Sequence, residues 1–244
     1  MMSLAKKETL IELSEYARAV EAEFVRDLSP AERDASGAPD AWAAKDILAH
    51  VTSWRRRGVE WIRGAERGEL PEDIQEFEEA NQKIFLENRG LSWDEALAQS
   101  ADVWDAFLTA LSNLPEVLLS PPEPPPAEAG PPLWRRLTID AANHPVLHFA
   151  EHASRNGRSE TAARWVEGLT PTLLALDGSA DWHGVVHYNL ACHYALAGRG
   201  DDSLDRLAIA FRLRPSLKDW APQDSDLKTL HEDPRFKALA GIHP

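Results

Sequence analysis

Residues 42–50 read Trp-Ala-Ala-Lys-Asp-Ile-Leu-Ala-His, and this stretch begins the helix that decides the fold. Apolar residues recur through the helix at helical steps, at Ile47, Val51, Trp54 and Trp61. Because such a stripe is typical of a helix that buries one face, we predict a helix over 43–67 that ends near Gly68. His50 belongs to this helix and is expected to point inward among large apolar neighbours.

The helical period extends over nearly the whole chain, and no stretch shows the alternation that is typical of a strand. We predict further helices over 3–28, 92–113 and 137–156, and a shorter helical segment over 71–88. Ser92 and Glu95 have the spacing of a capping box at the start of one of these helices. The fold class is therefore predicted to be all-α.

The segment 114–132 is rich in proline and cannot be a helix. Polyproline II is its expected local form. It has two interpretations, a PxxP ligand for a partner or a stiff loop within a domain. We favour the loop, because the helical pattern resumes directly after it. Pro145 is then expected near the start of the next helix, or at a kink in it.

The composition changes after Gly157, and the helices become shorter and paired. Residues 184–215 fit the tetratricopeptide template of about 34 residues. The template positions are occupied by Leu190, Ala191, Tyr194 and Ala210, while Ser203 replaces the usual alanine. We predict two domains, 1–157 and 158–244, the second a tetratricopeptide-like module with a preceding helix over 159–176 and a capping helix over 226–240. A single repeat leaves an apolar face exposed, so we expect this module to pack against the first domain or against a partner.

The net charge of −14 disfavours nucleic-acid binding, because the chain repels phosphate backbones. The short basic run 55–57 is interpreted as a solvated helix face. The single cysteine, Cys192, forbids an internal disulfide and is expected to be a small core residue. With no apparent signal peptide and no apolar run long enough to span a bilayer, a cytoplasmic location is expected.

Three histidines give the strongest indication of chemical function in the sequence. His50 lies on the helix described above, and His148 and His152 lie four residues apart in the stretch His-Pro-Val-Leu-His-Phe-Ala-Glu-His. Three imidazoles from two helices can hold a divalent metal and leave one coordination position open. The alternatives are a satisfied core histidine at His50 and a surface histidine at His148.

Residues 3–157 resemble the DinB-like four-helix-bundle superfamily, and most closely its DfsB branch, the colibactin self-resistance protein family. The resemblance depends on the Trp-x-x-Lys-Asp-x-Leu-Ala-His block at 42–50, on 81–89, on Leu114-Pro115 and on 148–152. It implies a four-helix bundle and a divalent metal, zinc or nickel, on His50, His148 and His152. Arg55 departs from the family pattern, since relatives commonly carry an acid there.

Trp54, Trp61 and His144 are candidates for a substrate pocket beside this site, with core packing as the alternative for the tryptophans. The first functional hypothesis is a protein that binds and hydrolyses or thiol-caps a reactive small molecule, in a resistance or detoxification role. The second is a non-catalytic adaptor whose repeat helices bind a protein partner. A homodimer through helix faces is also expected to be possible.

Overall fold

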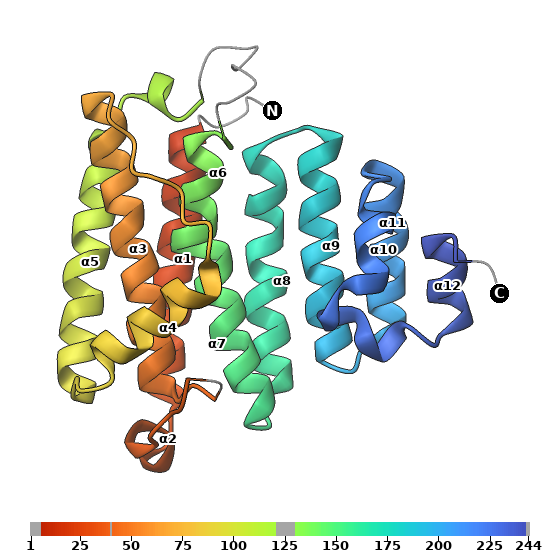
Figure 1. Cartoon of the computed structure of the whole chain (residues 1–244), viewed down its shortest axis with the longest axis horizontal. Coiled ribbons are helices and arrows are strands. Elements are labelled where there is room, and N and C mark those ends of the chain that lie inside the picture. The colour runs from red at the N-terminus through yellow and green to blue at the C-terminus, as the bar shows by residue number, and fades with distance from the viewer. Residues whose placement is uncertain (1–5, 40, 121–129, 243–244) are drawn as a thin grey trace. The chain divides into compact units, whose positions relative to one another are not determined.

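A computed structural model describes residues 6–39, 41–120 and 130–242 of the chain (Figure 1). Within these ranges the regular elements are helices, and the β pairing consists of an isolated bridge between Ala38 and Ala41. The all-α prediction is therefore confirmed. None of the helices in these ranges has the length and apolar character needed to cross a membrane. The chain divides into two compact units, Met1–His152 and Ala153–Pro244.

The first unit is a four-helix bundle (Figure 1). Its long helices are α1 (Lys6–Asp27), α3 (Ala44–Arg67) and α5 (Trp93–Asn113). The last side is formed by α6 (Leu133–Thr138), the π-helical turn η2 (Ile139–Asn143) and the start of α7 (His144–Arg155). Both α1 and α3 pack against α5 on one side and against α6 and η2 on the other, which closes the bundle around one core.

The apolar stripes predicted from the sequence face this core. On α1, the side chains at the stripe positions are all nearly inaccessible to solvent, namely Leu10, Leu13, Ala17, Val20 and Phe24. The capping box that begins α5 is also confirmed. Ser92 Oγ accepts a hydrogen bond from Glu95 N at 3.2 Å, and Glu95 Oε2 accepts one from Ser92 N at 2.7 Å. The helix α3 ends as expected at Gly68, whose φ of 72° suits glycine.

Shorter elements connect the long helices. The helix α2 (Pro30–Asp34) follows the N-cap Ser29, the helix α4 (Phe77–Asn88) crosses α3, and the 3₁₀ turn η1 (Glu116–Leu118) follows α5. The helical segment predicted over 71–88 begins only at Phe77, and residues 69–76 form an irregular connection that we call the strap. Most of the proline-rich stretch, 121–129, lies outside the described residues, so its polyproline II form stays a prediction.

Arg55 corrects the interpretation of the basic run 55–57 as a solvated face. Its side chain is completely buried, and its guanidinium pairs with Glu21 on α1 at 2.7 Å. Arg56, one residue further along, is exposed as expected. The residues of one helix turn point in different directions, so a run of three like charges on a helix does not share one environment.

Pro145 explains the π-helical turn. The helical run over 133–155 starts before the predicted 137, so Pro145 falls in its interior. A proline there has no N–H for the carbonyl four residues back, and a π turn accommodates the missing bond. Just before the proline, the N–H of His144 bonds to the carbonyl of Ile139, five residues earlier.

The second unit is built from α8 (Ser159–Leu176), α9 (Ala180–Leu196) and α10 (Gly200–Leu213). The helices α9 and α10 form a closely packed pair, in which the small residues Ala191, Ser203 and Ala210 are completely buried. A β-carbon on Gly184 would come within 2.7 Å of Arg214 Cβ, so the approach of the two helices requires glycine there. The tetratricopeptide likeness and the domain boundary after residue 157 stay predictions.

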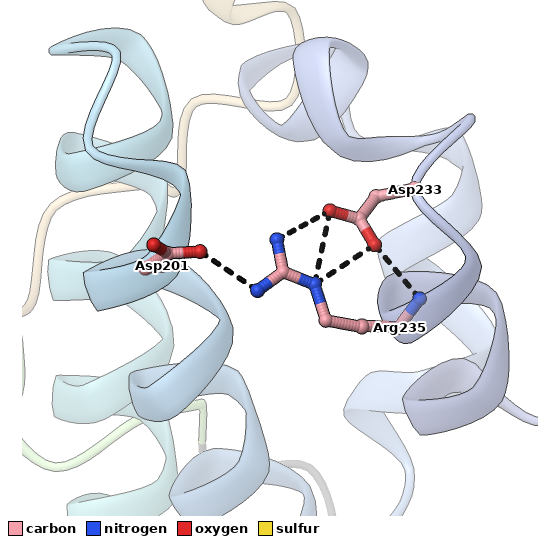
Figure 2. A network of polar contacts seen from close by, with 3 residues as sticks. All are labelled: Asp201, Asp233 and Arg235. Carbon is pink, nitrogen blue, oxygen red and sulfur yellow. Dashed lines mark hydrogen bonds and ion pairs between the residues drawn. The ribbon is translucent and has the colours of Figure 1, made fainter.

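Short elements complete the second unit, namely α11 (Leu217–Trp220), η3 (Ala221–Gln223), η4 (Ser225–Leu230) and α12 (Pro234–Ala240). The capping helix predicted over 226–240 is thus broken into a 3₁₀ turn and a short α-helix. Figure 2 shows Arg235 of α12 between Asp233 and Asp201, with its Nη1 2.7 Å from Asp201 of α10. Both side chains are largely exposed, so this ion pair contributes little to stability.

Candidate metal centre

Three histidines of the first unit meet between two helices. His50 comes from α3, and His144 and His148 come from successive turns of α7. The Nε2 atom of His144 lies 3.0 Å from Nε2 of His50 and 2.8 Å from Nε2 of His148. Each residue offers a ring nitrogen within 4.8 Å of those of the other two, as an ion shared by all three would require. We call these residues the histidine cluster.

His152, expected as a ligand, lies outside the histidine cluster, and His144 occurs in its place. The ring of His152 packs edge-on against Phe24 of α1 at 5.3 Å, and its Nδ1 lies 3.9 Å from Glu32. Each step of four residues turns an α-helix by roughly 40° beyond a full rotation. Over the two steps from His144 this drift rotates His152 toward α1. The predicted set of His50, His148 and His152 therefore differs from the group that the fold assembles.

The hydrogen-bonding capacity of imidazole conflicts with this arrangement. A neutral ring nitrogen either donates one proton or accepts with one lone pair. The Nε2 of His144 faces two other Nε2 atoms and can satisfy only one of them. In addition, Nδ1 of His50 is buried and has no hydrogen-bond partner in the described part of the chain. Buried polar groups are normally paired, and three ring nitrogens arranged in this way could hold a cation.

Burial keeps two members of the histidine cluster, His50 and His144, uncharged. Burial, with a smaller contribution from His148, lowers the pKa of His50 to about 3. Burial also lowers the pKa of His144 well below its usual value, and His148 and His50 lower it further. These two imidazoles are therefore neutral at pH 7. The neutral form is the one that binds metal, because its lone pair is available.

Aromatic side chains line the histidine cluster. The ring of Trp54 lies 6.2 Å from that of His144, and its other neighbour Phe77 begins α4. Trp42 is a second aromatic neighbour, with its ring 4.3 Å from His50 and 5.8 Å from His148. Sequence reasoning did not select Trp42 as a pocket residue, although it stands at the head of the stretch that decides the fold.

Trp61, the other predicted pocket residue, lies almost two helical turns beyond Trp54 on α3. Its ring is covered by two guanidinium groups, that of Arg136 at 4.2 Å and that of Arg57 at 5.6 Å. Trp61 is buried, and the described contacts connect it to these arginines rather than to the histidines. The structure thus brings Trp54 and His144 together with His50 and associates Trp61 with a neighbouring basic group.

Asp140 is a further ionisable group near the histidine cluster, one turn before His144. Burial raises the pKa of its carboxyl to about 7, although Arg57 and Arg136 act in the opposite direction. The residue lies in the π-helical turn, and such turns occur frequently at functional sites. Sequence reasoning missed Asp140, and the one available signal was an acid four residues before a histidine.

A second group of possible ligands lies in the second unit, formed by Cys192, Asp224 and Asp226. Here Asp224 already accepts a hydrogen bond from Tyr188 at 2.8 Å and caps the turn that follows. Burial raises the pKa of the Cys192 thiol, which disfavours the thiolate that a metal requires. Cys192 is buried, as expected of a core residue.

Comparison with known proteins identifies one family. The family model described as the DinB superfamily matches residues 14–158, a range that contains all three histidines of the cluster. No curated protein and no solved structure matches the chain.

Proposed function

Because the chain belongs to the DinB superfamily, we propose that it holds one divalent metal ion on His50, His144 and His148 and binds a reactive small molecule beside it. The observation that carries this proposal is the convergence of three Nε2 atoms, in which that of His144 can satisfy only one of the other two. A cation that accepts all three lone pairs removes the conflict.

The donor set fits zinc or nickel. Imidazole nitrogen suits both metals. Zinc binds nitrogen at about 2.0–2.1 Å, which places tetrahedral ligands about 3.3 Å apart. The Nε2 separations of 3.0 Å and 2.8 Å approach this value, and small ring rotations make up the difference. Three protein ligands leave a fourth position for water or substrate, as in catalytic zinc sites.

A bound ion supplies a Lewis acid that lowers the pKa of a coordinated water or thiol, or polarises an electrophile. The chain's own residues prepare this position. Trp42 and Trp54 border the histidines with apolar surface and suit a flat or apolar ligand. Asp140, with a pKa of about 7, is suited to take up or release a proton near neutrality. These features support hydrolysis or thiol capping of a reactive compound, and the DfsB likeness supports a self-protection role.

Metal analysis of the purified full-length protein tests this proposal. We expect about one equivalent of zinc or nickel per chain after loading and dialysis. His50→Ala should lose the metal while the helical circular dichroism spectrum is unchanged. Trp165→Phe, a change in the second unit, is the matched control and should keep it. A wild-type protein that retains no metal would contradict the proposal.

The second candidate function is partner binding by the second unit. The observation that favours it is the burial of small residues at the template positions Ala191, Ser203 and Ala210. A tagged full-length chain should capture a protein that a chain ending at residue 157 does not capture. Equal capture by both chains would contradict this role.

A further inference from the structure

A row of basic and aromatic side chains continues from the histidine cluster along α3 and along the α6–η2 segment that packs against it. On α3, His50 and Trp54 are followed by Arg57 and Trp61, and opposite them His144 is preceded by Asp140 and Arg136. Arg136 stacks on Trp61 at 4.2 Å, and both Arg57 and Arg136 act on Asp140.

Residues of the strap accept hydrogen bonds from both arginines. Arg136 forms a two-pronged pair with the carboxylate of Asp73, in which Nη2 lies 2.8 Å from Oδ2 and Nη1 contacts Oδ1. Arg57 donates to the backbone carbonyl of Glu72. Figure 1 shows the strap in orange, descending from the end of α3 to α4. Arg136 is thus engaged by a carboxylate held on a segment without regular structure.

The exposed fractions of the two side chains show that Arg136 is the more buried partner. The side chain of Arg136 is 18% exposed, whereas that of Asp73 is 44% exposed. The guanidinium is fixed by the ring of Trp61 beneath it, while Asp73 reaches it from the solvent side. A planar guanidinium that stacks on an aromatic ring holds its N–H groups in a fixed orientation. This orientation favours two parallel hydrogen bonds to one carboxylate.

The charge balance leaves room for an anion. Two guanidinium groups face Asp73 and Asp140, and burial raises the pKa of Asp140 to about 7. When Asp140 is protonated, one carboxylate remains for two positive charges. A ligand carboxylate that replaces Asp73 would preserve the present charge balance around the two arginines.

We propose that Arg57 and Arg136 form a carboxylate-binding subsite, which Asp73 of the strap occupies in the absence of ligand. The inference rests on the proposed function, because the ligand's other end would reach the histidine cluster. Arg136 precedes His144 by eight residues, a rise of roughly 12 Å along the helix. The ligand class is therefore an elongated monocarboxylate whose carboxylate replaces that of Asp73.

Calorimetric titration of the metal-free, full-length protein with octanoate tests the subsite. Octanol is the neutral probe of matched chain length. We expect octanol to bind at least about tenfold more weakly, because charge-assisted two-pronged bonds are the strong ones. Asp73→Asn should bind octanoate about tenfold more tightly than the wild type, since the internal competitor loses its charge. Arg136→Gln should lose at least about tenfold, and Arg63→Gln, on the exposed face of α3, should match the wild type.

Two results would overturn the subsite. One is equal binding of octanoate and octanol, and the other is an unchanged octanoate affinity in Asp73→Asn. Asp73 is half-exposed, so Asp73→Asn is expected to fold. It therefore still tests the subsite if Arg136→Gln fails to fold. Because these titrations use no metal, octanoate binding by a protein that takes up no zinc would contradict the proposed function alone. Zinc uptake without carboxylate discrimination would contradict the subsite alone.

Discussion

Two buried polar clusters in the first unit have opposite chemistry, although both use α3. In one, the carboxylate of Glu21 accepts hydrogen bonds from Arg55 at 2.7 Å, from Trp104 at 3.0 Å and from Ser100. The guanidinium of Arg55 also lies 3.5 Å from the ring of Trp104. In the histidine cluster, three like groups face one another. The first cluster pairs opposite charges, although Arg55 Nε has no hydrogen-bond partner within the described residues. In the second cluster the Nε2 of His144 faces two like atoms and can satisfy only one of them.

This contrast separates a cluster that specifies the fold from a cluster that indicates a ligand. Breaking a matched cluster leaves a buried charge alone, so its loss is expected to appear in stability. Removing one imidazole from the histidine cluster relieves a conflict, so its loss is expected to appear in binding. The predictions below test this difference, in order of decreasing effect.

The largest effect is expected from Arg55→Ala. The substitution leaves the Glu21 carboxylate buried without its opposite charge, which should reduce the free energy of unfolding by about 3–5 kcal/mol. Urea denaturation followed by circular dichroism measures this. Arg56→Ala, at the adjacent exposed position, should change it by less than about 0.5 kcal/mol.

A double substitution sharpens the interpretation of that result. Replacing both partners, Glu21→Met with Arg55→Met, leaves no lone buried charge and should cost less than Arg55→Ala alone. If Arg55→Ala and Arg56→Ala were equally stable, the cluster would not contribute to the fold in the way described.

The next effect concerns the identity of the metal ligands. At a free zinc concentration about one hundred times the dissociation constant, the wild type should gain about 2.7 kcal/mol in unfolding free energy. His144→Ala should lose this gain, because it removes the nitrogen that contacts both of the others. His152→Ala should keep it, since that ring packs against Phe24. If His152→Ala lost this gain and His144→Ala kept it, the ligands would be those expected from the sequence.

The fold was more predictable than the site, for a physical reason. Helical periodicity records burial of apolar surface, and the stripes of α1 and α3 were visible in the sequence. His50 and His148 were recognised because family likeness and spacing agreed. His144 is not predicted as a ligand, because the predicted helix begins later than the observed one. An ideal α-helical period also does not account for the π-helical turn before Pro145. Arg55 depends on Glu21, which is distant in the sequence, and Asp140 depends chiefly on burial, which no local sequence pattern indicates.

The Asp140 carboxyl provides a smaller, pH-dependent effect. Burial raises its pKa in the folded state to about 7, from a usual value near 4 in the unfolded chain. Between these values the folded state holds a proton that the unfolded state has released, so this group's stabilising contribution falls as pH rises. The stability of the wild type relative to Asp140→Asn should therefore decrease by about 1–2 kcal/mol between pH 5 and pH 7.

Denaturation of both proteins at each pH isolates this contribution, because all other titrating groups are shared. Arg57 and Arg136 face residue 140 in both proteins. A constant difference between the two proteins over this range would show that Asp140 titrates elsewhere.

The smallest effect tests how weakly α4 is attached beside the histidine cluster. Trp54 donates from Nε1 to Asn81 Oδ1 at 3.2 Å, and this is a single neutral hydrogen bond at a partly exposed position. Asn81→Ala should therefore lower the unfolding free energy by only about 0.5–1 kcal/mol. Gln82→Ala, exposed on the same helix, is the control. Zinc affinity should be unchanged in both variants, because Asn81 supplies no ligand. If Asn81→Ala lowered the unfolding free energy by several kcal/mol, α4 would be essential to the fold, as the Glu21–Arg55 cluster is expected to be.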